Sequence, residues 1–129
     1  MNRNILKFIL VYSLIAISLF GMVLTVLIIT RDEPPAKEID EARRAIFEAK
    51  KSGADQYAIF KFKDAETDYD SALYYLKAEN QKIFFKRNYN SCRKSARNSY
   101  TKAVEAKQDA IAVSKNFKKY LEEKIDSID

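Results

Sequence analysis

The chain has 129 residues and a formal net charge of +5, from 23 Lys or Arg and 18 Asp or Glu. It contains no His or Trp, one Cys, and two residues each of Gly and Pro. The single Cys excludes an intramolecular disulfide and a multi-cysteine zinc site, and without His the commonest general base and metal ligand is missing. We therefore expect a protein that is not an enzyme, with no catalytic residues, no metal and no cofactor.

An uncharged apolar segment dominates the N-terminal part of the chain. It covers residues 8–29 and reads FILVYSLIAISLFGMVLTVLII. As a helix, ~22 residues reach about 33 Å, which is enough to cross a hydrocarbon core of roughly 30 Å. We predict that residues 1–30 form a short tail and a single transmembrane helix.

A cleaved signal peptide is the main alternative to an uncleaved span. Its apolar core would have about 7–15 residues and end at small residues, whereas this segment runs on well beyond Ala16-Ile17-Ser18. Basic residues lie on both sides of the span, so the positive-inside rule does not assign its orientation. A very short tail is the usual form of an export signal-anchor, and we favour a C-terminal domain outside the cytoplasm.

Charge is unevenly spread over the rest of the chain. Residues 31–80 carry nine Lys or Arg and twelve Asp or Glu, a net charge of −3, whereas residues 82–119 carry eleven and two, a net charge of +9. One interpretation is that an acidic front half packs beside a basic later helix with solvated charges. The other is that the basic helix faces anionic lipid, nucleic acid or an acidic partner.

Two prolines separate the apolar segment from a helical domain predicted over residues 36–129. Residues 31–35 form a short, stiff hinge, because proline cannot continue a helix interior. Asp32 and Glu33 are expected near the positive end of the next helix. That helix is predicted over 36–52, with Gly53 as its C-terminal stop, and a second helix is predicted over 57–79.

A link over residues 80–87 precedes a third helix predicted over 88–127. Phe84 and Phe85 in the link are expected to plug the end of the helical hairpin; the alternative is that they form an exposed contact. The apolar stripe of the third helix continues through Val113, Phe117 and Tyr120, where the chain offers no obvious partner. We expect that part of the helix to project or fray.

The three predicted helices share a pattern of large and small residues at steps of three and four. It occurs as Ile39/Ala42/Ile46/Ala49, as Phe62/Ala65/Tyr69/Ala72 and as Tyr89/Cys92/Ala96/Ser99. Small residues on facing helices let the axes approach towards the low end of the usual 8–10 Å. The fold class predicted is therefore all-α, an antiparallel, tetratricopeptide-like three-helix bundle with a long C-terminal helix.

Two family resemblances follow from these residues. Ala65-x3-Tyr69-x2-Ala72-Leu73 is similar to the second helix of a tetratricopeptide repeat. Over residues 36–110, the order Ala42, Ala49, Gly53-Ala54-x2-Tyr57-Ala58, Ala65, Ala72, Cys92, Ala96, Ala103 resembles the alanine-rich helical domain of unknown function found in bacterial envelope proteins, often beside OmpA-like modules. This resemblance implies a non-catalytic, extracytoplasmic module at the bacterial inner membrane, and carries over no functional residues.

The candidate sites are interaction surfaces. The strongest is a basic patch of Arg87, Arg93, Lys94, Arg97 and Lys102, and Phe84 with Phe85 is a candidate aromatic contact. We expect a membrane-anchored module that binds or scaffolds an unknown protein partner through its helix faces, with a small-molecule substrate not expected. The alternative is a cytoplasm-facing domain whose basic third helix binds anionic lipid or, less expected, nucleic acid.

Overall fold

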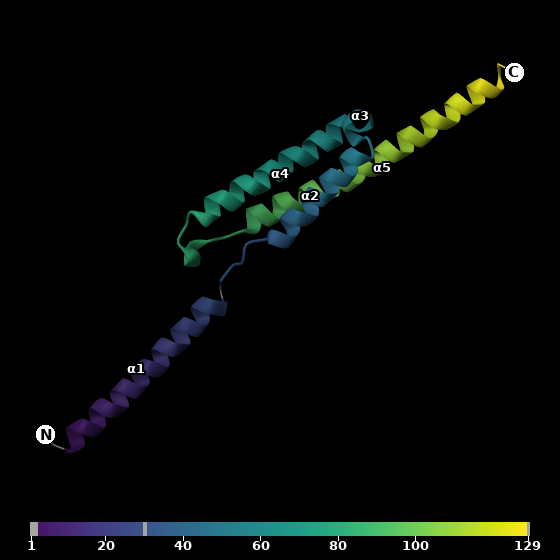
Figure 1. Ribbon diagram of the computed structural model, residues 1–129. Helices are drawn as coiled ribbons and strands as arrows, with labels where there is room; N and C mark the ends of the chain where they lie inside the picture. The colour runs from purple at the N-terminus through teal and green to yellow at the C-terminus, as the bar shows by residue number, and fades with distance from the viewer. Residues whose placement is uncertain (1–2, 30, 129) are drawn as a thin grey trace.

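The computed structural model describes residues 3–29 and 31–128, and these form helices joined by short links, without strands (Figure 1). The all-α class and the long C-terminal helix are confirmed. The elements in chain order are α1 (Arg3–Ile29), α2 (Ala36–Lys51), α3 (Ala54–Tyr57), α4 (Ile59–Asn80), the short 3-10 helix η1 (Phe84–Lys86) and α5 (Asn90–Asp126).

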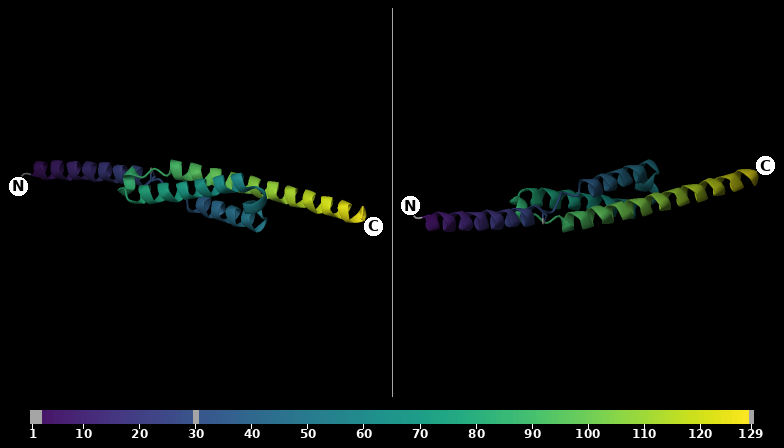
Figure 2. Two further views of the ribbon diagram at one scale, coloured as in Figure 1. Left: turned by 90° about the horizontal axis from the view of Figure 1, so that it is seen from above. Right: turned by 90° about the horizontal axis from the view of Figure 1, so that it is seen from below.

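The helices form a rod with the two ends of the chain at opposite tips (Figures 1 and 2). α2 leads away from α1, α4 returns alongside it, and α5 runs back in the direction of α2. α5 packs along both α2 and α4, whereas α2 and α4 touch each other much less. The bundle therefore depends on α5 as its common element.

α1 stands apart from this bundle. It has 27 residues, none of them buried, and no charged side chain lies between Lys7 and Ile29. It is long and apolar enough to cross a membrane, although an N-terminal signal sequence would have the same character. No other helix in the described part of the chain has this length and composition.

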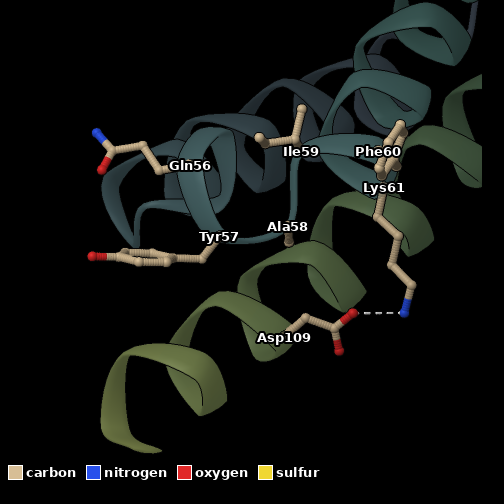
Figure 3. A pocket seen from close by; sticks show the side chains of 7 residues that line it. All are labelled: Gln56, Tyr57, Ala58, Ile59, Phe60, Lys61 and Asp109. Carbon is tan, nitrogen blue, oxygen red and sulfur yellow. Dashed lines mark ion pairs between the residues drawn. The ribbon is translucent and has the colours of Figure 1, made fainter. Parts of the chain in front are cut away.

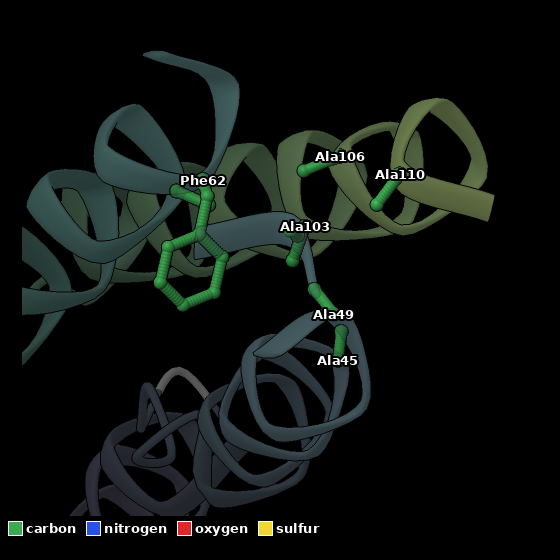
Figure 4. Packing of buried hydrophobic residues seen from close by; sticks show 8 residues of the cluster. Ala45, Ala49, Phe62, Ala103, Ala106 and Ala110 are labelled. Atoms are coloured by element: carbon green, nitrogen blue, oxygen red, sulfur yellow. The ribbon is translucent and has the colours of Figure 1, made fainter. Parts of the chain in front are cut away.

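The core of the bundle is made of small side chains, as the repeated pattern predicts. Figure 4 shows one cluster in which alanines from α2 and α5 meet Phe62 of α4. A second cluster, nearer α1, joins Ala72 to Tyr89, Cys92 and Ala96. The predicted small positions are all buried: Ala42, Ala49, Ala65, Ala72, Cys92, Ala96, Ser99 and Ala103. Ala106 and Ala110 continue the same spacing along α5 and are buried as well.

Two hydrogen bonds fix the register between α4 and α5. The Ser99 hydroxyl donates to the Ala65 carbonyl oxygen at 2.7 Å, and the Cys92 thiol donates to the Ala72 carbonyl oxygen at 3.2 Å. A side chain this short reaches a neighbouring helix backbone only where the two helices are in close contact. The predicted role of small residues in close helix packing is therefore seen directly in this pair.

The turn between α2 and α4 differs from the sequence prediction. Gly53 ends α2 as predicted, with a left-handed φ of 80° that residues with a Cβ rarely adopt. The chain then forms the one-turn helix α3 before it bends at Ala58, whose φ is −136°. Tyr57 therefore ends α3 rather than beginning the second long helix.

Enlarging a buried alanine tests the close packing. We expect Ala96→Leu to lower the free energy of unfolding by about 1–3 kcal/mol, because Ala96 is fully buried and the added carbons would overpack the core. The matched control is Ala112→Leu, on the exposed part of the same helix, which should change stability by less than about 0.5 kcal/mol. Urea unfolding of the full chain in detergent, followed by circular dichroism, measures both. Equal effects in the two variants would contradict the packing argument.

Candidate interaction surfaces

Two arginines of the predicted basic patch are engaged within the molecule. Arg93 pairs with Asp32 at 2.7 Å and donates to the Glu33 carbonyl oxygen at 2.7 Å. Arg97 and Arg93 also lie 3.7 and 3.8 Å from the carboxylate of Glu38, at the start of α2. These cations hold the 31–35 hinge and α2 against α5.

The other three members of the patch lie elsewhere. Arg87 donates to the carbonyl oxygens of Lys82 and Asn80, at 3.0 and 3.2 Å, and so covers the C-terminal end of α4. Lys102 faces α4 and pairs with Asp68 at 2.7 Å, which raises the pKa of the lysine. Lys94 is exposed. The five residues are not gathered on one surface, and a binding role for them stays a prediction.

Asp32 joins the hinge to the start of α5. The sequence predicts that it lies near the start of α2 instead. Its carboxylate accepts the backbone N–H of Tyr89 at 2.6 Å and pairs with Arg93. Partial burial raises the pKa of Asp32, but the Tyr89 N–H and the Arg93 guanidinium outweigh it and hold the pKa below its ordinary value. The positive end of a 37-residue helix adds to this preference for a carboxylate.

The expectation that Phe84 and Phe85 plug the hairpin is wrong. The two side chains are 50% and 56% exposed, and their rings meet edge to face with centroids 5.3 Å apart. The side chain that closes this end of the core is Tyr89, which is fully buried and donates its hydroxyl to Asn80 Oδ1 at 2.6 Å. The alternative, an exposed aromatic pair, describes the arrangement.

The last part of α5 projects beyond the bundle, as predicted. Ala110 is the last buried residue, and every described residue from 111 to 128 is exposed. Val113, Phe117 and Tyr120 continue the spacing of the buried alanines and are 44%, 55% and 55% exposed. The stripe that packs inside the bundle therefore continues outside it without cover from the described residues.

An open depression of about 370 Å³ lies where α5 leaves the bundle (Figure 3). Its polar contact is the ion pair between Lys61 Nζ and Asp109 Oδ2, at 2.7 Å. The hydrogen bond that Lys61 donates to Asp109 raises the pKa of the lysine. Beside this pair lie apolar side chains of the bend, of which Phe60 is 88% exposed.

The single cysteine is part of the packing of the bundle. Cys92 is fully buried in the core, as expected, and burial raises the pKa of its thiol. Among the described residues, no group of three or more His, Cys, Asp or Glu is placed to hold a metal ion.

Comparisons with known proteins add no assignment to these surfaces. No protein-family model, no curated protein and no solved structure matches the chain. The resemblance to the alanine-rich envelope domain stays a prediction.

Removing the Asp32 carboxylate tests its role as a latch, that is, as the side chain that fixes the 31–35 hinge to the start of α5. We expect Asp32→Ala to lower the free energy of unfolding at neutral pH by about 1–2 kcal/mol, through loss of a charge-assisted hydrogen bond at a helix start. Because the folded-state pKa is lowered, this stabilisation is present above the unfolded value of about 3.9 and is lost as the pH falls through the folded value. The difference in free energy of unfolding between the Asp32→Ala variant and the unchanged protein should therefore become smaller in acid.

The matched control is Glu122→Ala, which removes an exposed carboxylate from the projecting part of α5. It should leave stability nearly unchanged at both pH values. Urea unfolding of the full chains, at neutral pH and near pH 3, measures the difference. An Asp32→Ala gap that stays constant with pH would show that the carboxylate charge contributes nothing.

Proposed function

We propose that this protein is a single-pass membrane protein that holds a non-catalytic, tetratricopeptide-like helical module outside the cytoplasm, where it binds a protein partner. The observation that carries the binding role is the exposed stripe on the projecting part of α5. In this proposal α1 is an uncleaved signal-anchor in the inner membrane. The bundle sets the direction in which α5 is presented.

The membrane anchor is supported by the surroundings of α1. Its apolar side chains are largely exposed over the described range, for example Phe8 at 65% and Ile28 at 70%. Such an area in water would be strongly unfavourable, because apolar patches on soluble monomers are rarely larger than a few hundred Å². A lipid bilayer removes this cost along the whole length of the helix.

The binding surface is supported by its continuity with the core. Within the bundle, the stripe that includes Ala103, Ala106 and Ala110 packs against helices on two sides. Beyond Ala110 the stripe keeps its spacing but changes to large side chains such as Phe117 and Tyr120. Large apolar side chains at helical spacing suit a partner helix laid along α5.

A different protein suits this surface better than a second copy. Two copies anchored in one membrane would present α5 side by side in the same direction. Lys124 lies at the next position of the stripe, four residues after Tyr120, so parallel pairing through the stripe sets Lys124 of one copy beside the same lysine of the other. Like charges that face each other at such a position destabilise a parallel pair.

The alternative, a cytoplasmic domain that binds anionic lipid or nucleic acid through its basic third helix, has less support. Arg93 and Lys102 are already paired with Asp32 and Asp68. Neutralised cations release few counterions on binding, so the electrostatic gain would be small.

Reporter fusions at the C-terminus test the topology. We expect alkaline phosphatase to be active and a reporter that fluoresces only in the cytoplasm to stay dark. A fusion to residues 36–129 alone, which lacks α1, is the control and should give the reverse. Cytoplasmic fluorescence of the full-length fusion would contradict the proposed orientation.

A photoreactive amino acid at position 117 tests the partner surface in intact cells. We expect an adduct of one discrete mass with Phe117 replaced, and no such adduct with Tyr74 replaced, a control on α4 that is 70% exposed. Adding Leu121→Asp should reduce the adduct about tenfold, since a buried charge at a helix pair costs more than 1.4 kcal/mol. An adduct of twice the mass of the chain would indicate a second copy and contradict the choice of partner.

A further inference from the structure

We propose that the segment around η1, residues 82–87, is a second membrane contact. In this proposal Phe84 and Phe85 enter the boundary between headgroups and acyl chains of the bilayer that α1 crosses. The inference rests on the proposed membrane anchor and adds to it a site of lipid contact.

The first observation is position. Phe84 lines a depression together with Arg31, Asp32, Pro34 and Arg87, so it lies beside the chain just after α1 ends at Ile29. Figures 1 and 2 show η1 level with the C-terminal end of α1 along the rod, in all three views. A helix that spans the bilayer places its last turn at the interface, and η1 is then at the same depth.

The second observation is the chemistry of the exposed side chains. Ile83, Phe84 and Phe85 are consecutive and are 58%, 50% and 56% exposed. Lys82 and Lys86 flank them and are exposed as well. Apolar and aromatic side chains beside a lysine are typical of segments that lie in the membrane interface, where a lysine such as Lys86 reaches lipid phosphates.

The third observation is that the segment is held in shape. Arg87 donates to the carbonyl oxygens of Asn80 and Lys82, and Glu79 accepts the backbone N–H of Asn88 at 2.9 Å. Glu79 also pairs with Lys82 at 2.6 Å. These contacts fix the loop at both ends while the two phenyl rings stay about half exposed. A preorganised contact of this kind loses little entropy when it meets lipid.

Single tryptophan reporters test the contact, because the chain has no Trp of its own. The full-length protein carrying Phe85→Trp is reconstituted into nanodiscs of phosphatidylcholine and phosphatidylglycerol, with bromine on the acyl chains near the headgroups. The control is Phe60→Trp, which is 88% exposed and lies at the opposite end of the bundle. Phe84→Trp is a second reporter for the loop.

We expect bromine to quench the loop reporters about twofold or more and to leave Phe60→Trp unchanged, since interfacial side chains lie about 5–10 Å deep. Loop reporters that behave like Phe60→Trp in protein held by the nanodisc would overturn the lipid contact alone. Quenching of all three would also overturn it, because the whole bundle would then lie on the membrane. Protein that does not copurify with nanodiscs would overturn the anchor, and the contact with it.

Discussion

The close contact between α4 and α5 is the constraint on which the rest of the structure depends. Ser99 and Cys92 donate hydrogen bonds to carbonyl oxygens of α4, which requires the helices to lie near each other over two turns. Alanine at the buried position between them, Ala96, leaves room for the two helix axes to lie this close. α2 packs along α5 as well as α4 does. Among the described residues, the large aromatic side chains buried in this core are Phe62 and Tyr89.

A core of alanines buries little apolar area per residue, so polar contacts at its edges carry a larger share of the stability. Most of these are exposed ion pairs, such as Lys61 with Asp109, and each contributes little. Asp32 differs because its carboxylate serves a guanidinium and a backbone N–H at once, at the start of the longest helix. Part of the charge asymmetry is used within the molecule, since Asp32 of the hinge and Glu38 of α2 meet Arg93 and Arg97 of α5.

The sequence predicts those features that repeat along one helix, and misses those that depend on which segments meet. Alanine spacing identifies the buried face of each helix, and Gly53 marks the end of α2, because both signals are local. The partner of Asp32 lies 57 residues away, at Tyr89, so proximity in sequence pointed to α2 instead. Phe84 and Phe85 look like core residues by composition, but Tyr89 already fills that end of the core. The one-turn helix α3 and the bend at Ala58 carry no local pattern that identifies them, and the sequence therefore predicts the second long helix from residue 57.

The two ends of the rod differ: one end fastens the hinge to the bundle, and the other presents exposed apolar side chains of α5. The end near α1 gathers the hinge, the two phenylalanines of η1 and the Asp32 latch, so that the chain leaving α1 is fastened to α5 within a few residues. These contacts hold residues 32 and 33 of the hinge against the start of α5. At the other end, α5 runs past the bend between α2 and α4 and presents apolar side chains where no described helix covers them. Because one continuous helix, α5, joins these contacts to the projecting stripe, the hinge and the stripe proposed to bind a partner belong to the same rigid element.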